Sequence, residues 1–274
     1  MRGRRIATGR STLLTGKRKL SVLIEIEAAT SKKNRYTKLV DDRKECRKCA
    51  AVVNPSVCAG GKYDNAAHIG PWSDWQGNLN ADTMIIGQEW GGTDNYERQF
   101  GRDRDGDPTN ANLVTLMANI GVTLPPPSAM QGTTENGVFF FTNGVLCLRR
   151  GAATNRTDGE KGAKNNAISK DTFGNCARTF LRAQIELVEP RFVLVLGLLA
   201  WNGLMGAFSL APRNTLKEAF QRGHLPLNKS TIAFPLFHCG SKLHLNRPLH
   251  LQIDDWKKMK ALMDKHPLRP VTTL

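Results

Sequence analysis

The sequence predicts an α/β fold with a parallel β-sheet covered by helices on both faces. Four short stretches are almost wholly apolar and are typical of buried strands. Stretches with helix-start and helix-stop residues lie between them. Strands that are apolar along their whole length are typical of a parallel sheet with both faces covered, and alternation of strands with helices gives this arrangement.

The expected strands are TMIIG at 83–87, GVFFFTN at 137–143, RFVLVLG at 191–197 and STIAFPLF at 230–237. The expected helices span 107–121, 173–190, 199–206, 214–223 and 248–265. The first of these helices has the clearest ends, because Asp107 is an N-cap residue, Pro108 takes the first helical position and Gly121 stops it. A further short helix is expected in LSVLIEIEAA, near the N-terminus.

Charge and domain organisation indicate a nucleic-acid partner. The net charge is +15, and residues 1–19 contain seven Lys or Arg and no acid. Such a balance favours a polyanion. We expect a basic N-terminal extension at 1–35 and a single domain at 36–274. No apolar run is long enough to span a bilayer, and no secretory signal is expected, although a transit peptide stays open for the basic arm.

Polar side chains follow three of the expected strands. Gly87, Gln88 and Glu89 follow the first strand, Asn143 ends the second and His238 follows the fourth. Parallel sheets place ligand sites at the carboxyl ends of their strands. An acid, an amide and an imidazole should therefore meet at one edge of the sheet, which predicts a binding or catalytic site there.

Each of these residues has a chemistry suited to a nucleotide. The Glu89 carboxylate can orient a water or stabilise a developing cation. The Asn143 amide offers a donor and an acceptor that match the N3–H and O4 edge of uracil or, when flipped, the edge of another base. His238 can donate to a base carbonyl, and Ser241 and Lys242 suit phosphate. The plainer alternatives are a solvated turn for Glu89, a turn cap for Asn143 and a structural histidine.

Four of the six cysteines form a candidate metal set. Cys46 and Cys49 are a chelating C-x-x-C pair, and Cys147 and Cys176 follow singly. Such a set fits either a four-cysteine zinc site or an iron–sulfur cluster. The alternative is that the cysteines are free and buried. Cys58 is a spare thiol that could replace one ligand.

Together these motifs resemble the uracil-DNA glycosylase superfamily, and most closely its iron–sulfur family 4 branch. GQEWG at 87–91 looks like motif A, TNGVLC at 142–147 like the strand-end Thr-Asn with a ligand cysteine, and HCGS at 238–241 like motif B. The stretch 176–200 is similar to the cysteine-bearing helix, proline and third strand of the family. The resemblance runs from about Cys46 to Lys265.

The resemblance implies a three-layer αβα sandwich around a four-stranded parallel sheet and a glycosylase that acts on DNA containing deaminated bases. It implies that Asn143 binds the flipped base, that His238 stabilises the charge on its O2, and that Glu89 positions water. Gly87 and Gln88 would supply backbone contacts, and Phe100 or Trp90 would stack on the base. It also implies a structural 4Fe–4S cluster on the four cysteines, with zinc as the alternative.

This sequence departs from the motifs at several positions. Gln88 stands where the family has Glu, Trp90 where it has Pro, and Cys239 where motif B has Pro. The segment between Cys147 and Cys176 is also long. Uracil is the expected base, while hypoxanthine or xanthine, or weak binding of single strands or abasic sites, stay open. We expect a cytoplasmic, nucleoid-associated monomer that works in base excision repair.

Overall fold

The computed structural model describes residues 11–71, 76–130, 139–151, 168–240 and 247–266. Its centre is a five-stranded sheet in the order β3-β2-β5-β7-β6. The strands are β2 (Thr83–Gly87), β3 (Phe139–Asn143), β5 (Phe192–Leu196), β6 (Leu225–Pro226) and β7 (Ile232–Leu236). Strands β2, β3, β5 and β7 are mutually parallel and coincide with the four predicted strands. The predicted four-stranded parallel sheet is therefore present.

The fifth strand, β6, was not predicted. It has two residues and pairs antiparallel with β7 at the edge of the sheet. Two residues are too few to show a period of two, and Pro226 cannot donate to a ladder, so only an edge position is open to it. The edge strand leaves the predicted fold class unchanged.

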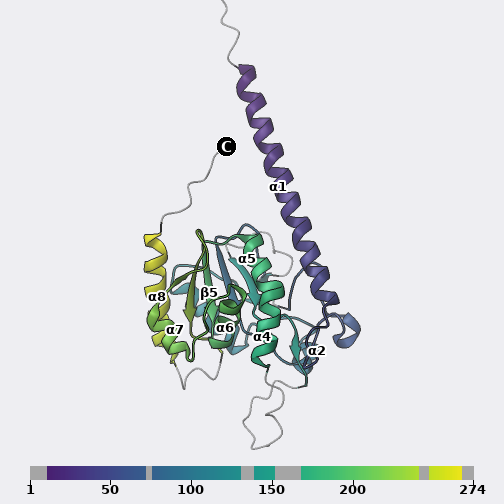
Figure 1. Cartoon of the computed structure of the whole chain (residues 1–274), viewed down its shortest axis with the longest axis vertical. Coiled ribbons are helices and arrows are strands. Elements are labelled where there is room, and N and C mark those ends of the chain that lie inside the picture. The colour runs from purple at the N-terminus through teal and green to yellow at the C-terminus, as the bar shows by residue number, and fades with distance from the viewer. Residues whose placement is uncertain (1–10, 72–75, 131–138, 152–167, 241–246, 267–274) are drawn as a thin grey trace, which may run out of the picture.

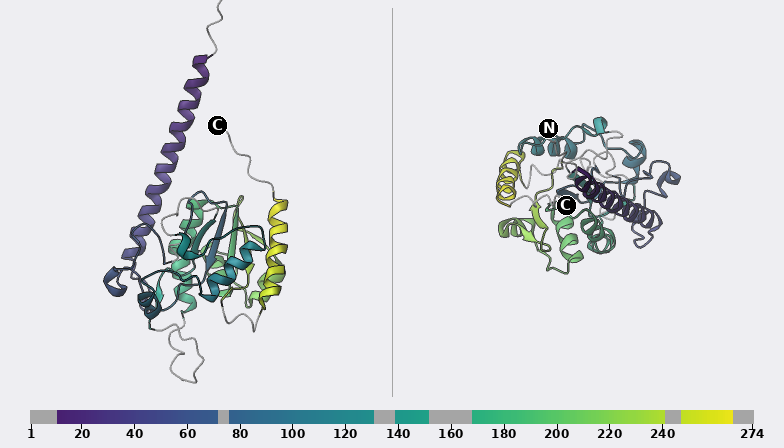
Figure 2. Two further views of the ribbon diagram at one scale, coloured as in Figure 1. Left: turned by 180° about the vertical axis from the view of Figure 1, so that it is seen from behind. Right: turned by 90° about the horizontal axis from the view of Figure 1, so that it is seen from above.

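Helices cover both faces of the sheet, as Figures 1 and 2 show. Alternate residues of β2 point to opposite faces, so Met84 and Ile86 pack in one core and Ile85 in the other. The first face is covered by α1 (Ser11–Glu45), α4 (Lys170–Cys176), the π-helical turn η4 (Ala177–Leu181), α5 (Arg182–Val188), α6 (Leu198–Ala207) and α7 (Leu216–Arg222). The second is covered by α3 (Pro108–Ala118) and α8 (Leu249–Lys265). The result is the three-layer sandwich.

Local sequence explains where these helices begin and end. Asp107 caps α3 by accepting from the Thr109 N–H at 2.8 Å, and Ser169 caps α4 in the same way through Thr172 at 3.1 Å. The run α4-η4-α5 ends at Glu189, which takes a left-handed conformation with φ 54° immediately before Pro190. The predicted helices at these positions are confirmed, with η4 as a π-helical turn within the predicted helix 173–190.

Helix α1 is much longer than the short helix predicted from LSVLIEIEAA. It runs without a break across residue 36, the predicted start of the domain, and its N-terminal end projects away from the sheet (Figure 1). Tyr36 and Val40 are buried in the core on the first face. Its last turn carries Arg43, which is fully buried. No helix of the described part has the length and apolarity to cross a membrane.

Five short elements were not predicted from the sequence. Strands β1 (Val52–Val53) and β4 (Leu148–Arg149) form a separate two-stranded antiparallel ribbon. Helix α2 (Thr93–Arg98) follows β2, and 3-10 turns span η1 (Cys58–Gly61) and η2 (Pro127–Met130). Each is shorter than two turns of helix or three residues of strand, so periodicity does not mark it.

We predict that Asp64→Ala strongly destabilises the fold. Arg43 and Asp64 form a buried bidentate pair at 2.8–2.9 Å, and Asn54 also accepts from Arg43. Removing the carboxylate leaves a buried guanidinium without its charge partner, which costs about 3–5 kcal/mol. Urea denaturation measures this loss.

Asp42→Ala is the matched control, because Asp42 pairs with Lys38 on the exposed side of the same helix. Exposed pairs of this spacing contribute about 0.3–0.5 kcal/mol. Equal effects of the two substitutions would contradict the assigned role of Arg43.

Candidate active site and cysteine cavity

A small polar pocket of about 110 Å³ lies at the carboxyl edge of the parallel sheet. Its wall contains the predicted residues from all three strand ends, namely Gly87, Gln88, Glu89, Trp90, Asn143 and His238. The remaining lining comes from α2 and its C-cap, the loop before α3 and the first turn of α3: Asn95, Gln99, Asp103, Arg104, Asp107, Thr109 and Asn110. The predicted meeting of an acid, an amide and an imidazole therefore occurs.

Strand register brings the motif A loop to Asn143. Gly87 is paired with Asn143 in the parallel ladder of β2 and β3. Beyond the strands the pairing continues, since the Gly144 N–H donates to the Gly87 carbonyl at 2.8 Å and the Val145 N–H to the Gln88 carbonyl at 2.9 Å. The carbonyls of Gly87 and Gln88 are therefore each engaged by the segment that follows β3.

The Gln88 side chain packs against a glycine that the site requires. Gly197, just before α6, has φ +96°, and a Cβ there would lie 2.2 Å from the Gln88 Nε2. Only glycine fits this conformation and this contact. Gln88 thus lines the pocket, and its side chain packs against Gly197.

Glu89 is largely buried in the wall of the pocket. Burial raises the pKa of its carboxyl, and the nearby Arg149 guanidinium, 3.3 Å away, opposes that rise. Asn143 is 4% exposed, and its amide has no hydrogen-bond partner among the described residues. A buried amide with free donor and acceptor atoms at a pocket wall is suited to bind a ligand edge.

His238 is held as a neutral imidazole in a defined tautomer. Burial lowers its pKa from 6.5 to about 4, against the opposing charge of Asp107. Its Nδ1 accepts a hydrogen bond from the Gly240 N–H at 3.0 Å. The ring proton therefore sits on Nε2, which makes this nitrogen a donor.

Of the two aromatic residues predicted to stack on a base, Trp90 lines the pocket and Phe100 does not. Phe100 has φ 55° at the end of α2, is 65% exposed and packs edge-on against Tyr63. Phe100 is not among the residues that line the pocket. Ser241 and Lys242 lie outside the described residues. The sequence analysis also missed Asp103, Arg104 and Asp107, for which the charge-dense GRDRDGD at 101–107 is the available signal.

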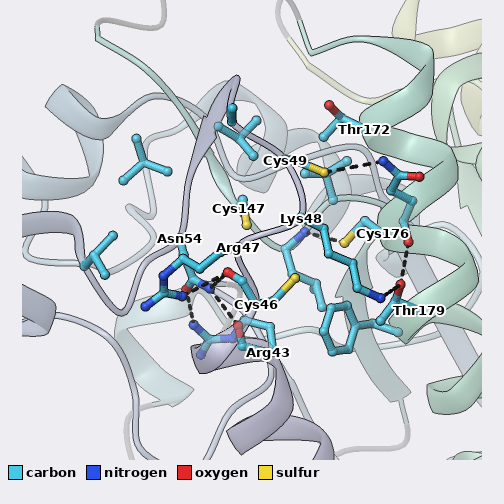
Figure 3. A pocket seen from close by; sticks show the side chains of 18 of the residues that line it. Arg43, Cys46, Arg47, Lys48, Cys49, Asn54, Cys147, Thr172, Cys176 and Thr179 are labelled. Atoms are coloured by element: carbon cyan, nitrogen blue, oxygen red, sulfur yellow. Dashed lines mark hydrogen bonds between the residues drawn. The ribbon is translucent and has the colours of Figure 1, made fainter.

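The four predicted ligand cysteines line one cavity of about 270 Å³ (Figure 3). Cys46 and Cys49 come from the segment between α1 and β1, Cys147 from the segment before β4, and Cys176 from the end of α4. No disulfide joins any of the six cysteines. The sequence motifs thus gather all four thiols, from three separate segments, around one space.

Two of the four sulfurs accept hydrogen bonds at the cavity wall. The Leu146 N–H donates to the Cys176 sulfur at 3.4 Å, and the Asn175 amide to the Cys49 sulfur at 3.8 Å. Burial raises the pKa of Cys147 to about 12. Within the described residues, no group of three or more Cys, His, Asp or Glu side chains is placed to hold a metal ion.

Cys58, the spare thiol, lies elsewhere. It donates to Glu97 at 3.5 Å and packs with Tyr96 and Leu148 in a separate apolar cluster. It is not among the residues that line the cysteine cavity. Its predicted use as a substitute ligand has no support from this position.

The family comparison agrees with the fold and the site. The sequence model of the family described as "Uracil DNA glycosylase superfamily" matches residues 75–258. The chain therefore belongs to the uracil DNA glycosylase superfamily, whose members act on DNA. It is similar to the "Type-5 uracil-DNA glycosylase" of Pyrobaculum aerophilum, with 27% identity over 177 residues that cover 62% of this chain and 69% of the relative. The predicted superfamily resemblance and fold class are confirmed.

We predict that Asp107→Asn lowers the pKa of His238 further, because the Asp107 charge favours the imidazolium. An NMR titration of the imidazole signals measures it. Since the unfolded chain binds this proton near pH 6.5 and the folded chain only near 4, His238 removes stability as the pH falls between these values.

Asp105→Asn is the matched control, because Asp105 lies in the same loop but is exposed and accepts from Ser128. It should leave the His238 titration unchanged. A titration of His238 near its ordinary value in the unsubstituted protein would contradict the assigned buried neutral state.

Proposed function

We propose that this protein is a DNA glycosylase that hydrolyses the N-glycosidic bond of uracil in DNA, the first step of base excision repair. The observation that carries the proposal is the meeting of Glu89, Asn143 and His238 in one small pocket at the carboxyl edge of the sheet. Membership of the uracil DNA glycosylase superfamily supports it.

The proposed reaction separates two opposite charges. When the bond between C1′ and the base breaks, the sugar becomes an oxocarbenium-like cation and the base leaves as an anion. The Glu89 carboxylate opposes the sugar charge and orients the water that adds to C1′. The neutral His238 donates through Nε2 to O2 of the base and stabilises the anion without first losing a proton.

Base recognition falls to Asn143. Its amide oxygen accepts from N3–H of uracil, and its NH₂ donates to O4. Cytosine presents the opposite pattern of donor and acceptor at these positions, so the same amide orientation rejects it. The base must first leave the helix stack, at a cost of a few kcal/mol, and the positively charged chain binds the DNA phosphates.

Pocket size supports a pyrimidine over a deaminated purine. The pocket has about 110 Å³, whereas an engineered protein cavity of about 150 Å³ holds a single benzene ring. A pocket this small is closer in size to one six-membered ring than to two fused rings. Hypoxanthine and xanthine have two fused rings and would need the wall at Trp90 to move.

We also propose that the cysteine cavity holds a structural 4Fe–4S cluster on Cys46, Cys49, Cys147 and Cys176. The cavity volume, the N–H donors to two sulfurs and the four thiols support a cluster over a single zinc ion, which draws its four sulfurs to Zn–S distances of about 2.3 Å. Hydrolysis transfers no electrons, so the cluster's part is to tie its three segments together.

We predict that Glu89→Gln lowers single-turnover uracil excision by about 10²–10⁴-fold, since the amide keeps the shape but cannot act as a base or oppose a cation. The assay uses a labelled oligonucleotide with one uracil, single-stranded or opposite guanine, with alkali cleavage of the product. Glu186→Gln, on the exposed side of α5, should excise at the unsubstituted rate.

Uracil excision by Glu89→Gln at the unsubstituted rate would contradict the catalytic role proposed for the Glu89 carboxylate. No excision by the unsubstituted protein would contradict uracil as the substrate. The same assay with hypoxanthine and xanthine, and a binding assay with single strands and abasic sites, would then identify the alternative.

We predict that Cys147→Ser removes most of the iron, because a ligand is lost from the cavity wall. Iron and zinc analysis of the anaerobically purified protein should give about four iron atoms per chain before substitution. Cys58→Ser is the matched control: this buried thiol lies outside the cavity, so its variant should keep the metal. A zinc-loaded, iron-free protein would contradict the cluster.

A further inference from the structure

Arg149 lies where three segments of the site meet. Its backbone pairs with Val52 in the β1–β4 ribbon. On the other side, its N–H donates to the Gly91 carbonyl at 2.8 Å, and a parallel bridge links it to Gly92. Arg149 is therefore fixed between the segment that follows Cys49 and the motif A loop. Backbone pairing on both sides of Arg149 therefore fixes the position from which its side chain extends.

The side chain of Arg149 is directed at Glu89. The Nη2 to Oε1 distance is 3.3 Å, and the two side chains are 29% and 14% exposed. The Arg149 Nε is buried and has no hydrogen-bond partner in the described part of the chain. No acid other than Glu89 forms an ion pair with Arg149 among the described residues, so the guanidinium charge acts mainly on this carboxylate.

Other charged groups around the pocket do not replace this one. Asp103 and Asp107 line the same pocket from the loop before α3, together with Arg104, and His238 is neutral. Burial raises the pKa of the Glu89 carboxyl, and the charge that lowers it is that of Arg149. Arg149 therefore favours the ionised form of Glu89.

We propose that Arg149 is a positioning residue for base excision, which holds Glu89 as a carboxylate and fixes its orientation in the pocket. This inference rests on the proposed function, in which Glu89 acts in its ionised form. A merely structural ion pair would contribute stability alone. A positioning charge must also set the pH at which the enzyme gains activity, and this difference decides between the two roles.

The test is the pH dependence of single-turnover uracil excision for the unsubstituted protein, Arg149→Met and Arg149→Lys. Activity should rise with pH as Glu89 ionises. Arg149→Met removes the charge that favours the carboxylate, so the rise should move to higher pH. Arg149→Lys keeps a positive charge near the same place. The rise in activity should therefore occur close to the pH at which it occurs in the unsubstituted protein.

Arg150→Met is the matched control. Arg150 is the next residue and also borders the cysteine cavity, but its guanidinium bonds to the Ala50 carbonyl at 3.0 Å. Arg150→Met should leave unchanged the pH at which the excision activity rises. Iron content is measured for all variants, so that a change in the cavity is not mistaken for a change at Glu89.

A second readout needs no activity. Carbon-13 NMR of labelled glutamate carboxyls gives the pKa of Glu89, whose signal is the one missing from Glu89→Gln. Arg149→Met should raise this pKa, and Arg150→Met should not. An unmoved pH profile and an unmoved Glu89 pKa in Arg149→Met would overturn the inference. If the unsubstituted protein excises no uracil, the proposed function fails, and the NMR titration still decides whether Arg149 controls Glu89.

Discussion

The pairing of residues 87–92 with 143–149 is the constraint on which the rest of the site depends. It begins as the parallel ladder of β2 and β3 and continues past the strand ends through N–H donation from Gly144, Val145 and Arg149. A strand end that is free on one side would let its loop move. Here two strand ends hold each other, so the groups of the pocket keep one geometry, which electrostatic stabilisation of a transition state requires.

The same pairing connects the two cavities. One segment of seven residues carries Asn143 at the polar pocket, Cys147 at the cysteine cavity and Arg149 at Glu89. Under the proposed function, base recognition, cluster binding and control of the acid therefore share one piece of backbone. The apolar strand β3 thus ends in the amide Asn143, and Cys147 follows four residues later. The sheet ends there, and each successive residue faces a different neighbour.

Sequence patterns predicted the parallel strands and the main helices because those elements are long enough to show apolar runs and caps. They also predicted the meeting of Glu89, Asn143 and His238, since a parallel sheet sends its carboxyl ends to one edge. The set of four cysteines was predicted from the C-x-x-C pair and the two later cysteines, and the resemblance implied the cluster. The ribbon β1–β4 and the ion pair of Arg149 were not predictable, because two-residue strands have no period and the pair joins residues 60 positions apart. The orientation of Phe100 was also missed, because it depends on one left-handed φ.

The central claim is that Asn143 reads the base while Cys147, four residues on, serves the cluster. The most direct measurement is excision of uracil and iron content, in parallel, on purified Asn143→Ala. The account predicts that excision falls by orders of magnitude while the iron content stays that of the unsubstituted protein. Excision at the unsubstituted rate would contradict the base-reading role of Asn143, and loss of iron together with excision would contradict the separation of the two roles.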